Sequence, residues 1–123
     1  MELTNTELDR KCAELIMGWE MEKDWHGEYW TEGNGILARP TIYESYCSHW
    51  HPSTDLNQAW QVVGKILLDM PHITCELVCY KNLAHKVIYL FSFKFDDGNI
   101  IETSELELSR AICLACIQAW EGK

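Results

Sequence analysis

The chain has 123 residues, of which 47% are hydrophobic, and its ten Lys and Arg against nineteen Asp and Glu give a formal net charge of −9. This length suits a single domain over residues 1–123 that buries a modest core, and the acidic balance disfavours partners such as bulk nucleic acid or an anionic membrane. Met1 is not followed by a basic, apolar leader, and no apolar run is long enough to span a bilayer, so we expect a cytosolic protein.

The first predicted helix covers about residues 5–17. Thr4 and Glu7 have the spacing of a capping box, and Gly18 marks the end of the helix. Apolar residues recur at helical spacing at Leu8, Cys12, Leu15, Ile16 and Trp19.

An aromatic-rich, irregular segment follows at about residues 20–51. Two weak strand candidates, Glu28–Glu32 and Ile36–Tyr43, are joined by a turn that contains Asn34-Gly35. Long segments of this kind in a compact domain are usually functional or disordered, and the large aromatic residues argue against disorder. They are Trp25, Tyr29, Trp30, Tyr43, Tyr46 and Trp50.

The second helix is the most strongly marked element of the sequence. Ser53 is its predicted N-cap, and Asp55 lies in its first turn, where a carboxylate favours the positive end of the helix dipole. Pro71 ends the helix, because proline disfavours helical geometry in the residue before it. The apolar positions are Leu56, Ala59, Trp60, Val63, Leu67 and Met70.

Three strands are predicted next, as an antiparallel meander. Ile73–Tyr80 alternates, with Cys75, Leu77 and Cys79 on the side expected to face the core. Val87–Phe95 is apolar on one face and, in its first half, on the other as well, which predicts a central strand with a layer on each face of the sheet. The turn at 96–99 leads into a short strand at Ile100–Thr103.

The last predicted helix, Leu108–Trp120, is apolar almost all round, and Ser104 with Glu107 has capping-box spacing. Such a helix is either buried between other elements or covered by a second subunit. We therefore predict a homo-oligomer, at least a dimer, with this helix and Ile117 at the interface. The predicted fold class is α+β, a small antiparallel β-sheet packed with helices in the order α-(β)-α-β-β-β-α.

Several stretches resemble the phage ABA (α/β/α) sandwich family of small phage and prophage proteins. They are Trp50-x-Pro52-Ser53-Thr54-Asp55 with the following Ala59-Trp60-x-Val62-Val63, then Met17-Gly18-Trp19, and residues 109–115, whereas residues 20–48 match only loosely. The resemblance implies an α/β/α sandwich, and the family has no established common activity to carry over. Because small accessory phage proteins commonly antagonise host defences, it also implies a counter-defence role in the host cell cytoplasm.

Metal-type donors occur in two sets, Cys47-x-His49-x-His51 and Cys75-(x)3-Cys79. Neither set is a compact zinc knuckle, so we predict that the thiols are free and that no metal is bound. The chain also has no nucleophile motif, no phosphate-cradling glycine loop and no carboxylate pair placed by a motif. We therefore expect neither an enzyme nor a cofactor.

The best-founded binding site is the start of the second helix. The N–H groups and hydroxyls of Ser53 and Thr54 can receive a phosphate, and Trp50 can stack on a base. Arg39 and Lys86 are candidate cations for the same ligand. If the site lies elsewhere, we expect it among Trp25, Tyr29 and Trp30.

From these features we predict that the protein binds a small anionic, nucleotide-like ligand. The ligand would be an immune signal of the cyclic oligonucleotide or cyclic ADP-ribose type, which the protein sequesters without cleaving it. Asp55 competes with such an anion, so capping alone is the other interpretation of Ser53 and Asp55. The alternative function is a protein-interaction inhibitor of a host enzyme, or another accessory role without a small-molecule ligand, because Trp and Tyr are typical interface anchors.

Overall fold

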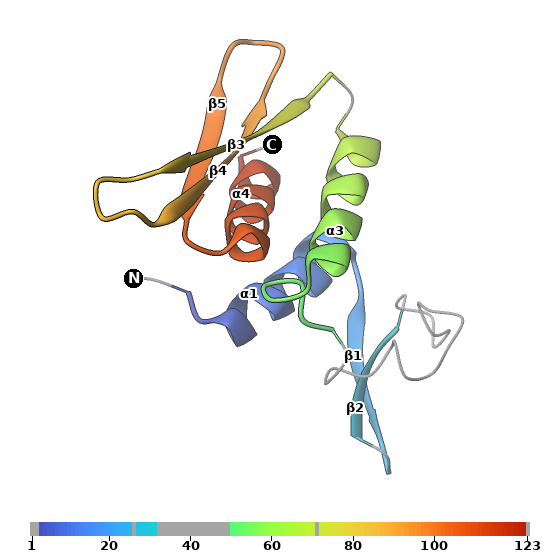
Figure 1. Cartoon of the computed structure of the whole chain (residues 1–123). Helices are drawn as coiled ribbons and strands as arrows, with labels where there is room; N and C mark the ends of the chain where they lie inside the picture. The colour runs from blue at the N-terminus through green and yellow to red at the C-terminus, as the bar shows by residue number, and fades with distance from the viewer. Residues whose placement is uncertain (1–2, 26, 32–49, 71, 123) are drawn as a thin grey trace.

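The computed structural model describes residues 3–25, 27–31, 50–70 and 72–122 (Figure 1). The helical elements are α1 (Asn5–Lys11), the π-helix η1 (Cys12–Ile16), α3 (Leu56–Asp69) and α4 (Leu108–Glu121). The strands are β1 (Glu20–Asp24), β2 (Gly27–Thr31), β3 (Thr74–Lys81), β4 (Val87–Lys94) and β5 (Ile100–Glu105). This order, α-ββ-α-βββ-α, confirms the predicted α+β class.

The N-terminal helix begins where the sequence predicts, because the Thr4 hydroxyl accepts a hydrogen bond from the Glu7 N–H at 3.2 Å. It does not continue as one α-helix to residue 17. After Lys11 the chain widens into η1, in which the Met17 N–H donates to the Cys12 carbonyl at 3.0 Å. The wider turn buries Cys12, Ala13 and Ile16 together, and it leaves Leu15, which the helical spacing had placed on the apolar face, 38% exposed.

Helix α3 begins two residues later than the sequence predicts. Its N-cap is Asp55, whose carboxylate accepts a hydrogen bond from the Gln58 N–H at 3.1 Å, so the prediction of Ser53 as N-cap is wrong. The physical reason is a turn before the helix, in which the N–H groups of Thr54 and Asp55 both donate to the His51 carbonyl. Ser53 lies inside this turn and is fully buried.

The predicted meander is present as a sheet in the order β3-β4-β5, with β4 in the centre. Strand β5 extends to Glu105, so Ser104 belongs to a strand, and helix α4 begins after Glu107 without a side-chain cap. The predicted capping box of Ser104 and Glu107 is therefore wrong. Thr103 links the two elements instead, because its hydroxyl donates to the Ala111 carbonyl at 2.6 Å.

The described helices lie on one face of this sheet, which we call the inner face, and α4 packs against β4 and β5 (Figure 1). Phe91 and Phe93 lie on it fully buried, and Phe91 packs edge to face against Trp60 of α3 at 5.9 Å between ring centroids. On the outer face Val78 is 42% and Tyr80 46% exposed, and their partners on β4 are half-buried. Among the described residues, the helices thus lie on one face of the sheet and no helix is seen on the other.

Helix α4 lies in the middle of the fold, against the inner face of β4 and β5 and against α1, η1 and α3 (Figure 1). This packing buries Ala111, Ile112, Cys113, Ala115, Cys116, Ile117 and Ala119. The apolar surface of α4 is thus covered within one chain, and Ile117, at 3% exposure, is not available as an oligomer contact. The oligomer itself stays a prediction.

Strands β1 and β2 form a hairpin that extends away from the sheet and helices (Figure 1). Asp24 pairs with Gly27, whose φ of 132° is a conformation that favours glycine. Strand β2 corresponds to the predicted strand Glu28–Glu32, whereas Ile36–Tyr43 lies outside the described residues. None of the described helices is long and apolar enough to cross a membrane.

The described cysteines divide into a buried and an exposed group. Cys12, Cys113 and Cys116 are buried, and the hydrogen bond with Cys12, together with burial, raises the pKa of Cys113. Cys75 and Cys79 are exposed, so the prediction that they belong to the core is wrong. The reason is their place on an edge strand, because α4 packs beneath β4 and β5 rather than beneath β3.

Candidate functional site

A cavity of about 270 Å³ lies where α1, the β1–β2 hairpin and residues 50–51 meet. It combines two indoles, a thioether and both signs of charge. Its lining residues are Thr6, Asp9, Arg10, Met21, Glu28, Trp30, Trp50 and His51. Three segments that are far apart in the sequence therefore build one concave site, which we call the α1–hairpin cavity.

Asp9 holds two of these segments together. Its carboxylate accepts a hydrogen bond from the Ser53 N–H at 2.8 Å, and its main-chain carbonyl accepts one from the Trp50 indole N–H at 3.0 Å. Burial raises the pKa of the Asp9 carboxyl, while the hydrogen bonds of Ser53 and the nearby His51 act in the opposite direction. The Ser53 N–H, which the sequence analysis predicts as a phosphate donor, is therefore already bound to the Asp9 carboxylate.

His51 lies at the turn between Trp50 and helix α3. Its N–H donates to the Gln58 side-chain oxygen at 2.6 Å, and its carbonyl accepts from Thr54 and Asp55. Its ring nitrogen Nδ1 is buried and has no hydrogen-bond partner among the described residues. A buried polar atom without a partner costs free energy, so the imidazole of His51 reduces the stability of this turn.

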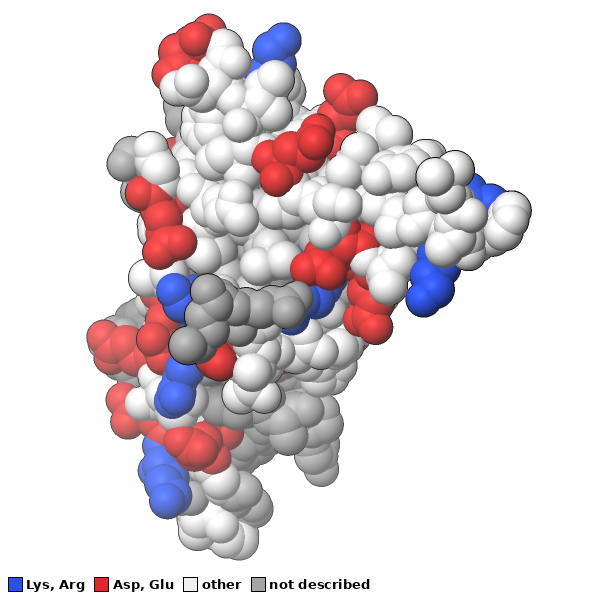
Figure 2. Space-filling view, turned by 90° about the vertical axis from the view of Figure 1, so that its left-hand side faces the viewer, with Lys and Arg blue, Asp and Glu red and all other residues white. Residues whose placement is uncertain are grey.

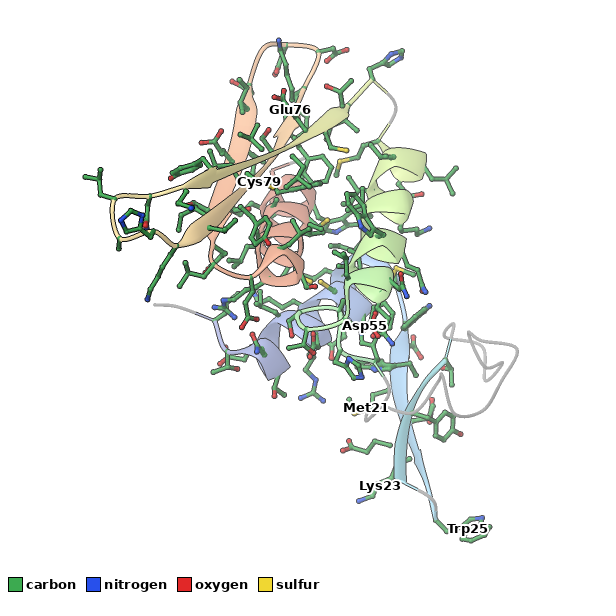
Figure 3. The ribbon with its side chains drawn as sticks, in the orientation of Figure 1. Met21, Lys23, Trp25, Asp55, Glu76 and Cys79 are labelled. Atoms are coloured by element: carbon green, nitrogen blue, oxygen red, sulfur yellow. The ribbon has the colours of Figure 1, made fainter. Side chains whose placement is uncertain are left out.

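Aromatic and sulfur-bearing side chains form the apolar part of the cavity wall. Trp30 and Trp50 are 2% and 3% exposed, and Trp50 packs edge to face against Trp19 at 4.7 Å between ring centroids. Met21 comes from the part of β1 nearer the helices, whereas Lys23 and Trp25 lie toward the hairpin tip (Figure 3). Because Trp50 is packed on its neighbours, it bounds the cavity rather than presenting an open face on which a base could stack.

The charges around the cavity are mixed. Arg10 pairs with Glu14 at 3.1 Å and lies against the Met21 sulfur at 3.3 Å, whereas Asp9 and Glu28 bring two carboxyl groups to the lining. Acidic side chains are also spread over the face of the molecule seen in Figure 2. These charges suit a ligand that offers several hydrogen-bond donors and carries its negative charge near Arg10.

The structure brings together some of the predicted site residues. Trp30 and Trp50 line the same cavity. Ser53 lies beside it, with its hydroxyl donating to the Asn5 carbonyl at 3.4 Å, and the exposed Thr54 donates its hydroxyl to the His51 carbonyl at 3.3 Å. Tyr29 neighbours Trp30 on β2 but is not among the cavity-lining residues.

The other predicted residues lie away from the cavity or outside the described chain. Trp25 is at the hairpin tip, 88% exposed (Figure 3). Lys86 is exposed in the loop between β3 and β4, at another part of the molecule (Figure 1). Arg39 lies outside the described residues, as do Cys47 and His49 of the first candidate metal set. Within the described ranges, no group of three or more His, Cys, Asp or Glu side chains could hold a metal ion.

The sequence analysis did not identify most of the polar lining, namely Thr6, Asp9, Arg10 and Glu28, as a binding site. Asp9 and Arg10 lie on the polar side of an amphipathic helix, a position typical of solvated charges. Glu28 and Met21 face the cavity only because β1 pairs with β2, and the charged sequence of β1 does not predict a strand. His51 was considered as a metal donor and not as part of a polar cavity.

Comparison with known families identifies the family of this chain. The family model described as "Phage ABA sandwich domain" matches residues 10–117. No curated protein and no solved structure matches the chain. The matched region includes Arg10, β1, β2 and residues 50–51, but not Thr6 or Asp9.

Proposed function

Because this chain belongs to the phage ABA sandwich domain family, we propose that it is a phage counter-defence protein that sequesters a small nucleotide-derived immune signal. The signal would be of the cyclic oligonucleotide or cyclic ADP-ribose type, held without being cleaved. One observation carries the proposal: the α1–hairpin cavity brings the charged side chains of Asp9, Arg10 and Glu28 together beside an apolar wall that includes two indoles. A concave site with a few convergent polar groups is the usual form of a small-molecule site.

The cavity suits the nucleoside part of such a ligand better than its phosphates. Asp9 and Glu28 can accept hydrogen bonds from base amino groups or ribose hydroxyls. Arg10 can bind one phosphate at the rim. We propose this arrangement in place of the predicted phosphate site at Ser53 and Thr54, because the Ser53 N–H already donates to the Asp9 carboxylate.

The size of the cavity limits how much of a ligand it encloses. Ligand pockets commonly measure about 300–1,000 Å³, and the α1–hairpin cavity, at about 270 Å³, lies just below this range. It can therefore enclose one nucleoside-sized part of a larger signal. The remainder of a cyclic oligonucleotide would lie outside the cavity, near the exposed Arg10.

The first experiment is native mass spectrometry of the protein after incubation with a nucleotide extract of host cells. A retained nucleotide is then titrated calorimetrically against the wild type and against Arg10→Gln and Glu28→Gln. Both side chains line the cavity, so we expect each substitution to weaken binding about tenfold or more, the effect of losing a charge-assisted hydrogen bond.

The matched control is Lys11→Gln, the next residue on α1, which does not line the cavity. Its affinity should stay within about twofold of the wild type, because a single charge outside the site is largely screened by salt. If no nucleotide is retained, or if the control weakens binding as much as Arg10→Gln, then this cavity is not the binding site.

A second candidate function is inhibition of a host protein, and the exposed Trp25 favours it. This indole is 88% exposed at the tip of a hairpin that extends from the body of the protein (Figure 3). Exposed Trp residues are frequent anchors of protein interfaces. In a pull-down from host lysate, Trp25→Ala should then lose a protein that the wild type and Lys23→Ala both retain.

A further inference from the structure

Strand β3 is an edge of the three-stranded sheet, and each of its eight residues is exposed. Its exposed side chains include Leu77, Val78 and Tyr80, at 37%, 42% and 46%. Glu76 and Cys79 lie along the same strand (Figure 3). An edge strand presents unpaired backbone groups on its open side, so a long apolar edge is a template for another strand.

The two edges of the sheet differ in charge. Strand β5 carries Glu102 and Glu105 and no cation, so a second acidic chain would be repelled there. Strand β3 carries one Glu and one Lys, and it is therefore a neutral edge on a chain with a net charge of −9. A second copy of this chain can approach β3 with the least electrostatic cost.

The sequence of β3 is also complementary to itself when two copies run antiparallel. Directly opposed residues share a face of a sheet, so a two-fold axis at Val78 puts Val78 against its own copy and Glu76 against Tyr80. On the inner face the same register puts Leu77 against Cys79 and Cys75 against Lys81. No like charges are directly opposed, and Glu76 meets a hydroxyl that can donate to it.

We propose that β3 pairs with β3 of a second copy, antiparallel and centred on Val78. The two three-stranded sheets then form one six-stranded sheet, with the outer-face residues Val78 and Tyr80 packed across the two-fold axis. This interface differs from the predicted one at α4, whose apolar residues are buried within the chain. It also lies at the opposite end of the molecule from the hairpin, so it is independent of the ligand proposal (Figure 1).

The experiment is light scattering with size-exclusion chromatography, from about 1 to 200 μM, an interval that brackets weak self-association. The wild type should approach twice the chain mass of 14.3 kDa. Tyr80→Glu places a carboxylate opposite Glu76 of the other copy, and the two-fold axis repeats this like-charge pair. The substitution should therefore weaken the dimer at least tenfold. The double variant Glu76→Lys with Tyr80→Glu restores opposite charges, and it should return the dissociation constant to within about threefold of the wild type.

Ile100→Glu is the matched control, because it adds the same charge to the other edge strand at a residue that is 60% exposed. It should leave the dimer unchanged. Val78→Lys gives a second test of the same register if Tyr80→Glu does not show a cooperative melt, since it opposes two ammonium groups at the axis. A wild-type monomer at every concentration overturns the proposal, even if β3 accepts a strand from another protein. Three other results also overturn the proposal. They are a dimer that survives Tyr80→Glu, a dimer that Ile100→Glu weakens as much as Tyr80→Glu does, and a dimer that the double variant fails to restore.

Discussion

At the residue scale, the hydrogen bond between the Asp9 carboxyl and the Ser53 N–H joins α1 to the segment before α3, beside the cavity. The two residues are 44 positions apart in the sequence, and the carboxyl is partly withdrawn from water. Burial disfavours the charged form of a carboxyl, whereas a hydrogen bond from a backbone N–H favours it. Because burial is the larger effect here, the pKa of Asp9 is raised above its ordinary value of 3.8.

This direction predicts how Asp9 changes stability with pH. Well below pH 3.8 the carboxyl is protonated in both the folded and the unfolded chain, and as the pH rises the unfolded chain ionises first. The folded state therefore loses stability as the pH rises from below 3.8 through the raised pKa. Asp9→Asn keeps an oxygen for the Ser53 N–H and does not titrate, so its stability relative to the wild type should increase over this interval.

The measurement is denaturant unfolding of both proteins from about pH 3 to pH 7, the range over which carboxyl groups ordinarily ionise. The difference between the two free energies of unfolding isolates Asp9 from the other acidic residues. If the free energy of unfolding of Asp9→Asn minus that of the wild type decreases with rising pH, then the hydrogen bond, and not burial, has the larger effect on the pKa of Asp9.

The N-cap of α3 gives a second prediction at this scale. Asp55→Ala removes the carboxylate that accepts from the Gln58 N–H, and it should lower the free energy of unfolding by about 1 kcal/mol. Asn57→Ala, an exposed position in the first turn of the same helix, is the control and should change it by less than about 0.5 kcal/mol. Equal losses in thermal or urea melts would contradict the assignment of Asp55 as the cap.

Residue types alone could not decide between Ser53 and Asp55, because both are good N-caps and both precede the same apolar pattern. The decision comes from Asp9, which binds the Ser53 N–H across a long sequence separation and fixes the turn before the helix. The sequence analysis therefore located the helix and the two cavity tryptophans. It could not locate their polar partners on α1, because no local pattern relates residues 9 and 53.

At the element scale, α4 behaves as the core of a single chain. Ile117→Lys places an ammonium group where the native side chain is 3% exposed, and burying an unpaired charge costs several kcal/mol. Since domains of this size are stable by about 5–15 kcal/mol, we expect the variant to lose most of its cooperative folding. Gln118→Lys, at the next and exposed position of α4, should melt like the wild type. A folded, monomeric Ile117→Lys would show instead that α4 is an interface.

Elements with a strong pattern could be predicted, and elements held by their neighbours could not. Helices α3 and α4 and strands β3–β5 were located from the periodicity of their apolar residues. The burial of β3 was not, because all eight of its residues are exposed at the edge of the sheet. Strand β1 has the charged sequence Glu20-Met21-Glu22-Lys23-Asp24, which lacks strand propensity and is ordered by pairing with β2. The π-helical turn of η1 likewise depends on what Cys12, Ala13 and Ile16 pack against, not on their residue types.

At the scale of the whole molecule, the described chain has a sheet on one side and its helices on the other, with α4 between the sheet and α1 (Figure 1). The apolar first half of β4 predicts cover on both faces, whereas on the outer face of the described chain Val78 is 42% and Tyr80 46% exposed. A single sequence cannot distinguish a face covered by its own chain from one covered by a partner, because both are apolar. The pattern of β4 therefore predicts cover on its outer face without identifying what provides it.

The same architecture predicts an uneven distribution of stability. Helix α4 is packed against both the sheet and the other helices, whereas β1 and β2 form a two-stranded hairpin, a unit that is marginally stable by itself. In native hydrogen exchange, amides of residues 108–121 should therefore exchange at the rate of global unfolding, and those of residues 20–31 orders of magnitude faster.

The hairpin also supplies Met21, Glu28 and Trp30 to the α1–hairpin cavity. A ligand bound in that cavity should slow exchange in 20–31 and leave 74–81 on the distant strand β3 unchanged. Equal slowing of both segments would mean that the ligand stabilises the fold globally and is not held by the hairpin.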